Sequence, residues 1–349
     1  MPAHWRHRVA LDIIANDMRM NINHGHRTTY FIATISLLGL VTAASHPAQA
    51  ESYPARPVRI IVPYGVGGIA DVTMRMVAHK LSERLGQQFL IDNRPSAGGV
   101  VAMQAAAVAA PDGYTLAMIG GGLTIARSLF KSLPYDITAD FVPISTTAFY
   151  GIIVATKAGS PLTSVAEIIG AARKNPGRLN FGTINPGSTQ HLAAELFRIA
   201  ASIEVTMIPY KTTPDVATGL LRGDVDVAFE YFPGFQAPIH DRQIVVVATT
   251  GKERAPNMPG VPTIGESGLP NYEVTSWNGL AAPAGVAPEI VTLLSRAVNE
   301  ALRSPDIQAI SRRAGMEARG STSEELRARI KSDVAKWADV IEKAAIEKK

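Results

Sequence analysis

Two glycine-containing loops are the places where the main chain itself could bind an anion. The first lies in "VRIIVPYGVGGIAD" at residues 58–71, and the second in "NPGSTQHLAAELF" at residues 185–197. Each leads into a helical pattern. Unpaired N–H groups at a helix start bind anionic groups, and glycine lets the main chain approach a ligand closely. Two such helix starts facing each other across a cleft would grip a small carboxylate.

In the first loop, we expect the aromatic residue and the start of the following helix to contact the ligand. Asp71, in the first helical turn, is better suited to capping its own helix than to contacting a ligand. The candidate residues here are Tyr64, Gly67, Gly68, Ile69, Ala70 and Asp71.

The second loop offers side-chain donors as well as main-chain ones. Ser188 is a plausible N-cap, and His191 could either donate to a carboxylate or bond to nearby backbone. Hydrogen bonds to a charged group are worth roughly 1.5–3 kcal/mol each, so a few suffice for micromolar affinity. The candidates are Gly187, Ser188, Thr189, Gln190 and His191.

Two further polar residues follow predicted strands. Glu230 ends the strand "VDVAFE"; lining a cleft, it would favour a ligand with an amine or hydroxyl, and otherwise it is a surface residue. Thr124, in "GGGLT", is a weaker candidate of the same kind. Trp277 and Phe149 fit packing in the core or a hinge better than stacking on a ligand.

A dinucleotide is the first alternative ligand. Gly65-x-Gly67-x-x-Ala70 matches the G-x-G-x-x-A fingerprint, and Asp92 follows a second strand. The acid at position 71 would repel a pyrophosphate unless it were engaged as a cap. No Gly-Lys-Ser/Thr follows the loop, which excludes a P-loop.

A serine hydrolase is the second alternative. Ser188 and His191 lie three residues apart on one helix and could approach each other. The sequence has no G-x-S-x-G elbow, and it suggests no acid that could orient the histidine.

The composition excludes several other classes. The sequence has 349 residues, no cysteine and a formal net charge of +4, half of which falls in residues 1–50. The balanced remainder has no basic stripe for nucleic acid. His79, His191 and His240, the histidines after residue 50, have no metal-ligand spacing. We therefore expect no metal, no cofactor and no nucleic-acid partner.

Residues 1–50 read as a secretory signal peptide. Arg19 and Arg27 precede a 14-residue apolar stretch, and Ala48-Gln49-Ala50 is a small-x-small cleavage site. Translation could start at Met1, Met18 or Met20. The alternative is an N-terminal membrane anchor, for which the apolar stretch is short. Cleavage would release a protein beginning at Glu51. Outside the cytoplasm this protein would not meet a pool of NAD or ATP, which weighs against a cofactor that must be replenished.

Strand-like and helical segments alternate along the rest of the chain. Helices are predicted near 70–85 and 188–200, a strand at 151–156, and helices from about Pro288 and Ser323. Ser321-x-x-Glu324 and Thr322-x-x-Glu325 are candidate capping boxes for the last helix. This alternation indicates an α/β fold with mostly parallel sheets, and the length favours two domains.

Several longer motifs occur in a fixed order. They are "YPARPVRIIVPYGVGGIAD", "NRPSAGG", "APDGYTL", "LPYDITADFVPI", "GSTQHLAAELF", "PYK", "VPTIGESGLPNYEV" and "WNGLAAPAG". Over about 300 residues, the chain resembles the substrate-binding proteins of tripartite tricarboxylate transporters, the Bug family. That family's loop typically reads Pro-Phe-Pro-Ala-Gly-Gly, so Tyr64 replaces Phe and Gly65 replaces Pro. Its Pro-Tyr-Lys-Gly becomes Pro-Tyr-Lys-Thr, and Glu230 stands for a frequent Asp. These departures leave the ligand's identity open.

The resemblance implies a type II periplasmic-binding-protein fold with a ligand cleft between two α/β domains. Domain 1 would be discontinuous, comprising residues 51–152 and 276–349, and domain 2 would span 153–275. It implies a periplasmic receptor, not an enzyme, that hands a small organic carboxylate to membrane permease subunits. The carboxylate could be a mono- or dicarboxylate, an aromatic acid or an amino acid. We expect a monomer; a receptor that serves a signalling partner instead of a permease is the remaining alternative.

Overall fold

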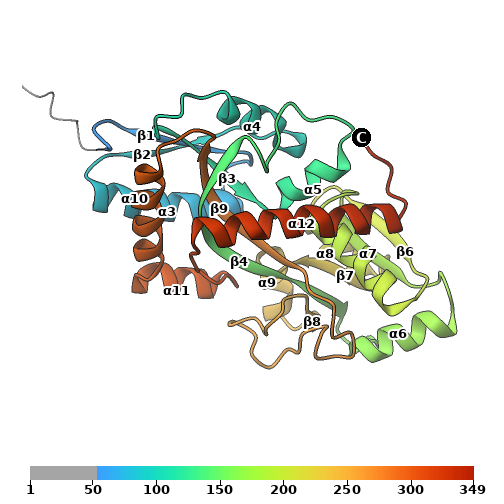
Figure 1. The fold of residues 1–349 in the computed structure, drawn as a ribbon. Helices are drawn as coiled ribbons and strands as arrows, with labels where there is room; N and C mark the ends of the chain where they lie inside the picture. The colour runs from blue at the N-terminus through green and yellow to red at the C-terminus, as the bar shows by residue number, and fades with distance from the viewer. Residues whose placement is uncertain (1–52) are drawn as a thin grey trace, which may run out of the picture. The chain divides into compact units, whose positions relative to one another are not determined.

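The computed structural model describes residues 53–349, so the predicted signal peptide lies outside the described residues. No helix within the described range is both long and apolar enough to cross a membrane. Figure 1 shows how helices and strands alternate along this part of the chain.

The strands are β1 (Val58–Val62), β2 (Phe89–Asn93), β3 (Thr115–Gly120), β4 (Phe141–Lys157), β5 (Asn180–Ile184), β6 (Thr206–Tyr210), β7 (Val227–Tyr231), β8 (Ile244–Thr249) and β9 (Thr275–Pro283). The helices are α3 (Ile69–Leu85), the 3-10 turn η1 (Ala97–Gly99), α4 (Val100–Ala107), α5 (Gly121–Leu129), α6 (Val165–Lys174), α7 (Thr189–Ala201), α8 (Thr213–Arg222), α9 (Phe232–His240), α10 (Pro288–Leu302), α11 (Pro305–Arg313) and α12 (Ser323–Lys343). The helices expected near 70–85 and 188–200, and from Pro288 and Ser323, are confirmed within about a residue at their starts.

One group of strands runs in the order β2-β1-β3-β9-β4. β1 pairs in parallel with both β2 and β3. Its apolar run is buried because helices cover the sheet: Ile60 belongs to the same buried cluster as Met74 and Leu81 of α3 and Leu294 of α10. Burial of these side chains fixes where β1 ends, and hence where the first glycine-rich loop begins.

A second group of strands carries the other glycine-rich loop. β5 pairs in parallel with β6 and β7, and the far half of β4 pairs with β7 and β8. Its core is aromatic: the rings of Phe181, Phe197 and Phe229 lie 5.5–6.0 Å apart. The helix α7 is held on this sheet through Phe197, and so the loop before α7 has a fixed position.

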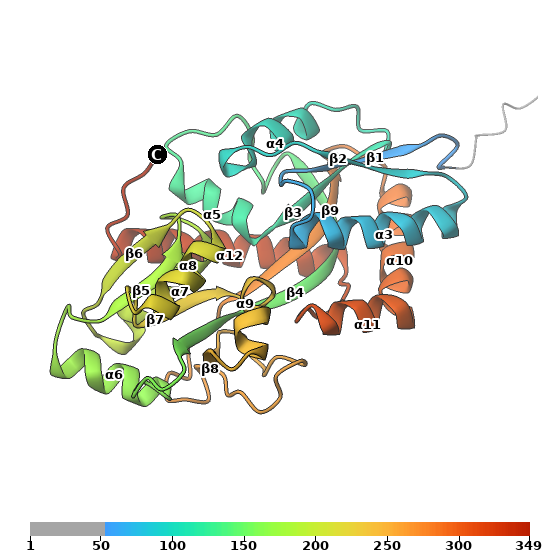
Figure 2. The same cartoon turned by 180° about the vertical axis from the view of Figure 1, so that it is seen from behind.

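The expectation of mostly parallel sheets is wrong, because the two strands that cross between the groups, β4 and β9, pair antiparallel with their neighbours. β4 is 17 residues long; its first part pairs antiparallel with β9, and its last part pairs antiparallel with β7 and β8. β9 also runs antiparallel to β3. Figure 2 shows these two strands passing between the two groups.

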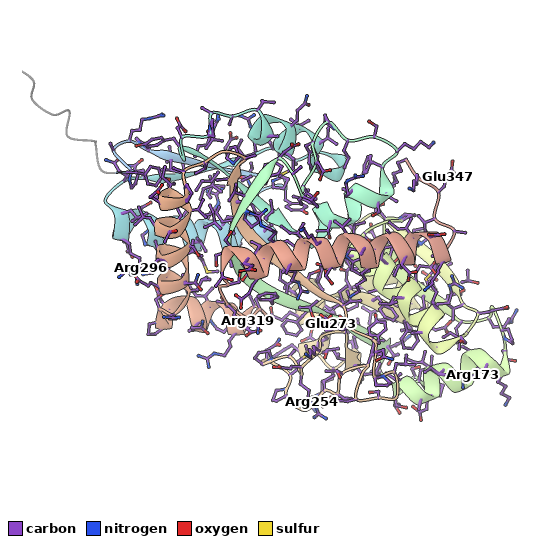
Figure 3. All side chains as sticks on the ribbon, in the orientation of Figure 1. Arg173, Arg254, Glu273, Arg296, Arg319 and Glu347 are labelled. Atoms are coloured by element: carbon purple, nitrogen blue, oxygen red, sulfur yellow. The ribbon has the colours of Figure 1, made fainter. Side chains whose placement is uncertain are left out.

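The long helix α12 lies along both groups, contacting α5, β4 and α7. Its capping box is the one formed by Thr322 and Glu325, as one of the two predicted patterns requires. Asp333 of α12 accepts a 2.6 Å hydrogen bond from the indole of Trp277, which is fully buried. Before the helix, Arg319 (labelled in Figure 3) lies over the ring of Phe149. The two aromatic residues are therefore packing residues of the crossing strands.

The aromatic core gives a first prediction. Phe229→Ala should lower the free energy of unfolding by about 3–5 kcal/mol, because it removes a fully buried ring from between two others. Urea unfolding followed by circular dichroism measures this. Val108→Ala, at a side chain that is 79% exposed, is the control and should change stability by less than about 0.5 kcal/mol. Equal effects of the two variants would contradict this assignment of the core.

Candidate functional site

A cleft of about 720 Å³ lies where loops from both groups of strands meet. It is bounded by the β1–α3, β3–α5 and β5–α7 loops and by side chains of β4, β7 and β9. Nine of the residues predicted from sequence line it: Tyr64, Gly67, Gly68, Ile69, Ala70, Gly187, Ser188, Thr189 and Gln190. The four other predicted residues, Asp71, Thr124, His191 and Glu230, lie outside this lining.

Asp71 holds the first loop from inside the protein. Gly67 has a φ of +85°, and its N–H donates to Asp71 Oδ2 at 2.9 Å. The same buried carboxylate accepts from Arg75 and Asn93. Burial disfavours its charge, but the hydrogen bonds from Arg75, Gly67 and Asn93 prevail and hold the pKa of Asp71 below its ordinary value. The N-cap of α3 is Gly68, so Asp71 braces the loop instead of capping the helix as expected.

His191 holds the second loop in a similar way. Gly187 has a φ of +83°, and its N–H donates to His191 Nδ1 at 3.4 Å. Burial is the main cause that lowers the pKa of His191; Lys349 adds to this, and Glu195, 3.9 Å away, opposes it. The ring is therefore neutral at pH 7 and bonds to nearby backbone, one of its two predicted roles.

Ser188 is the N-cap of α7, as its position predicts. Its Oγ accepts from the N–H of His191 at 3.1 Å and donates to the carbonyl of Ile184 at 3.2 Å. Glu195 is an acid near the histidine that the sequence did not suggest. The hydroxyl of Ser188, however, is directed to backbone, so these three residues are not arranged as a catalytic triad.

Glu230 lies beneath the lining, not in it. It is fully buried, and its Oε1 accepts from Gln190 Nε2 at 2.6 Å and from the N–H of Tyr231 at 2.8 Å. Burial raises the pKa of Glu230, against the hydrogen bonds that favour its charged form. Its visible effect is to fix the side chain of Gln190 at the cleft. Thr124 is also buried, and its hydroxyl donates to the carbonyl of Gly121.

The third loop was predicted through Thr124, but the residues that line the cleft are Gly120–Gly122, at the junction of β3 and α5. The glycine run itself was the signal for it. A Cβ added to Gly122 would lie 2.7 Å from the hydroxyl oxygen of Tyr64, so only glycine leaves room for that hydroxyl. Burial raises the pKa of Tyr64 to about 12, and the hydroxyl is therefore a donor at neutral pH.

The floor of the cleft comes from strands whose contribution no sequence motif marked. Tyr150 of β4 donates to Asn278 Oδ1 of β9 at 3.0 Å, and Tyr231 of β7 shares a 2.7 Å hydrogen bond with Ser276. The two tyrosine rings lie edge to face, with centroids 5.3 Å apart. Among the described residues, the buried Nδ2 of Asn278 has no acceptor. A buried donor of this kind beside a cleft indicates a polar ligand atom or water nearby.

This architecture is the mixed α/β fold of periplasmic binding proteins. An R. palustris protein, Rpa4515, whose structure was determined with adipate, has 33% sequence identity and a TM-score of 0.73, covering 84% of this chain and 99% of its own. MatC from Rhodopseudomonas palustris, with bound malate, has 27% identity and a TM-score of 0.68, covering 83% and 100%. BugT of Bordetella pertussis is 33% identical over 315 residues, 90% of this chain and 97% of that protein.

A family model, the tripartite tricarboxylate transporter family receptor, matches residues 73–346. The chain belongs to this family. Its members are solute-binding receptors and not enzymes, which removes both catalytic alternatives, the dinucleotide oxidoreductase and the serine hydrolase. The resemblance stated from the motifs is confirmed.

The buried carboxylate of the first loop gives a pH-dependent prediction. Asp71→Asn should cost about 1–3 kcal/mol at pH 7, because an amide cannot accept from all three donors. The folded-state pKa lies below 3.8, so this stabilisation is present above about pH 4 and is lost as the pH falls through the folded-state value. The wild-type and variant proteins should therefore converge in unfolding experiments as the pH falls below the folded-state pKa. Asp241→Asn, at an exposed position, is the control; a gap that does not narrow would refute the ionic role.

The contact between the second loop and α5 gives another prediction. A Cβ at Gly187 would lie 2.3 Å from Leu129 Cδ2. Gly187→Ala should therefore cost about 1–2 kcal/mol for the left-handed backbone and a further 1–3 kcal/mol for the overlap. Gly67→Ala is a matched control, because its φ is similar and a Cβ there meets nothing within 4 Å. Thermal unfolding should show Gly187→Ala as the more destabilised protein; the reverse order would contradict the contact.

Proposed function

We propose that this protein is an exported receptor that captures a small organic carboxylate in the cleft and delivers it to a tripartite tricarboxylate-type membrane transporter. One observation carries the proposal. Helix starts with free main-chain N–H groups meet at a cleft whose lining, within residues 53–349, includes no Asp or Glu. A carboxylate would meet donors there and no carboxylate side chain in the lining itself.

The donors come from three helix N-termini and from neutral side chains. α3, α5 and α7 all begin at the lining, after Gly68, Gly120 and Ser188. Tyr64, Tyr150 and Tyr231 are protonated, because burial raises the pKa of Tyr64 and Tyr231 to about 12 and the pKa of Tyr150 well above its ordinary value. Hydrogen bonds from neutral donors to an ionised group are roughly twice as strong as neutral pairs. The arrangement therefore suits reversible binding of an anion.

The remainder of the lining suits an apolar ligand body. Ile69, Leu129 and Phe130 contribute carbon atoms to the lining beside the tyrosine rings. A cleft of about 720 Å³ is in the usual range for small-molecule sites of roughly 300–1,000 Å³. The relatives whose structures hold adipate and malate support a carboxylate of this size.

The proposal includes two domains that close on the ligand. Residues 51–152 with 276–349 would form domain 1, and residues 153–275 domain 2. The pairing of β4 supports this division, because its partner changes from β9 to β7 and β8 near residue 152. A register shift between Val154 and Ala155 lies just beyond that point. Closure by a hinge would be driven by contacts that the ligand makes only in the closed state.

The family and the predicted signal peptide support export to the periplasm and delivery to permease subunits. The site residues of this proposal are the nine predicted residues that line the cleft, with Gly122, Tyr150, Tyr231 and Asn278 added from the lining. A signalling partner in place of a permease remains the second candidate for the receptor's output.

A thermal-shift screen of residues 51–349 tests the binding function. Adipate, malate, benzoate and glutamate are the probes, with NAD(H) in the same plate. A probe at a hundred times its dissociation constant should stabilise the protein by about 2.7 kcal/mol. The variant carrying both Ser188→Ala and Gly68→Val should lose most of this shift, because it removes the side-chain cap of α7 and adds a bulky side chain at the N-cap of α3, the two helix starts that would hold the anion. A shift with NAD(H) alone, or with no carboxylate in wild-type protein, would refute the proposal.

A further inference from the structure

The charge of the cleft depends on one side chain. Within residues 53–349, Lys349 is the sole charged residue of the lining; all others are neutral side chains or glycine. Its position after α12 is remote in sequence from every other lining residue, the nearest being Asn278. The ammonium is therefore the one positively charged side-chain group of the lining within residues 53–349, and it attracts an anion bound nearby.

The backbone of Lys349 is fixed at the edge of the cleft. Its N–H donates to the carbonyl of Leu129, and its carbonyl accepts from the N–H of Lys131, both at 2.9 Å. Residues 344–349 run from the end of α12 to the stretch after α5, as Figures 1 and 2 both show. These two hydrogen bonds hold the residue at the end of α5, on one side of the cleft.

The side chain of Lys349 reaches the other side. Its Nζ donates to the carbonyl of Pro186 at 3.4 Å, one residue before Gly187. That bond is long, its acceptor is neutral, and the side chain is exposed. The ammonium can therefore exchange this acceptor for a better one at small cost. Its charge also reaches into the loop, where it adds to the lowering of the pKa of His191 by burial.

We propose that Lys349 is a specificity-determining residue that pairs with the anionic group of the bound carboxylate. Its Nζ leaves the carbonyl of Pro186 and binds the carboxylate held by the β5–α7 loop. The cleft then favours anionic ligands over neutral ones of the same shape. This inference rests on the proposed function, since it requires a carboxylate in the cleft.

The test compares two neighbouring lysines. Lys349→Met removes the charge and keeps the length of the side chain; Lys348→Met does the same at an exposed residue outside this cleft. Calorimetry with adipate, malate, benzoate and glutamate identifies the probe that wild-type protein binds most tightly. Lys349→Met should bind that probe about three- to tenfold more weakly than wild type, a loss between those typical of exposed and of buried charged pairs. Lys348→Met should stay within about twofold of wild type, and Lys349→Arg should restore most of the affinity.

Salt dependence separates an ion pair from a structural link. The affinity of wild-type protein for the probe should fall more steeply between 20 and 200 mM NaCl than the affinity of Lys349→Met, because salt screens the attraction between the ammonium and the carboxylate. An amine-reactive ester, followed by mass spectrometry, should label Lys349 more slowly when the probe is bound, with labelling of Lys348 unchanged. Equal affinities and equal salt slopes for the two methionine variants would overturn the role of Lys349. Absence of binding by wild-type protein would instead overturn the proposed function, and this inference with it.

Discussion

The site depends on one local interaction, which occurs twice. At each long glycine-containing loop, a glycine with positive φ turns its N–H towards the side chain four residues later, Asp71 for Gly67 and His191 for Gly187. The turn brings the chain from the end of a buried parallel strand into the start of a helix. Each bracing side chain is buried and accepts from the N–H group of its glycine, which would otherwise compete with the N–H groups facing the cleft for an acceptor. The following N–H groups are thereby held in place before any ligand arrives.

The two braces differ in charge, and the difference has a physical reason. Asp71 is ionised because Arg75 and Asn93 also donate to it, so the first loop is held by charge-assisted hydrogen bonds. His191 is neutral, and its bond from Gly187 is longer, at 3.4 Å. The first loop is accordingly the more tightly held of the two. The second, which meets Leu129 and Lys349 across the cleft, is held partly by contacts from the opposite side.

The sequence predicted the parts of the site that are local. A strand, a glycine turn and an apolar helix face lie within 30 residues at each loop, so periodicity and capping preferences identify them. Tyr150 and Asn278 escaped because strand register, not a motif, brings them together across β4 and β9. The stretch 141–150 of β4 escaped too, since its proline, serine and threonines do not alternate as a half-buried strand would. Lys349 could not be predicted in this way, because two backbone hydrogen bonds, one to Leu129 at the end of α5 and one to Lys131 after it, determine its place.

The position of each contact relative to the crossing strands determines what a hinge can change. Tyr150 and Asn278 lie on paired strands and are hydrogen-bonded across them, so a bend in β4 beyond residue 152 moves them little. The contacts at Pro186 and Gly187 join the second loop to Lys349 and to Leu129 of α5, away from those strands. Displacement about the proposed hinge would grow with distance from its axis, so these contacts would separate first if the cleft opened. The floor would then select the body of the ligand in either state, while the rim engages its anionic group only when the cleft is closed.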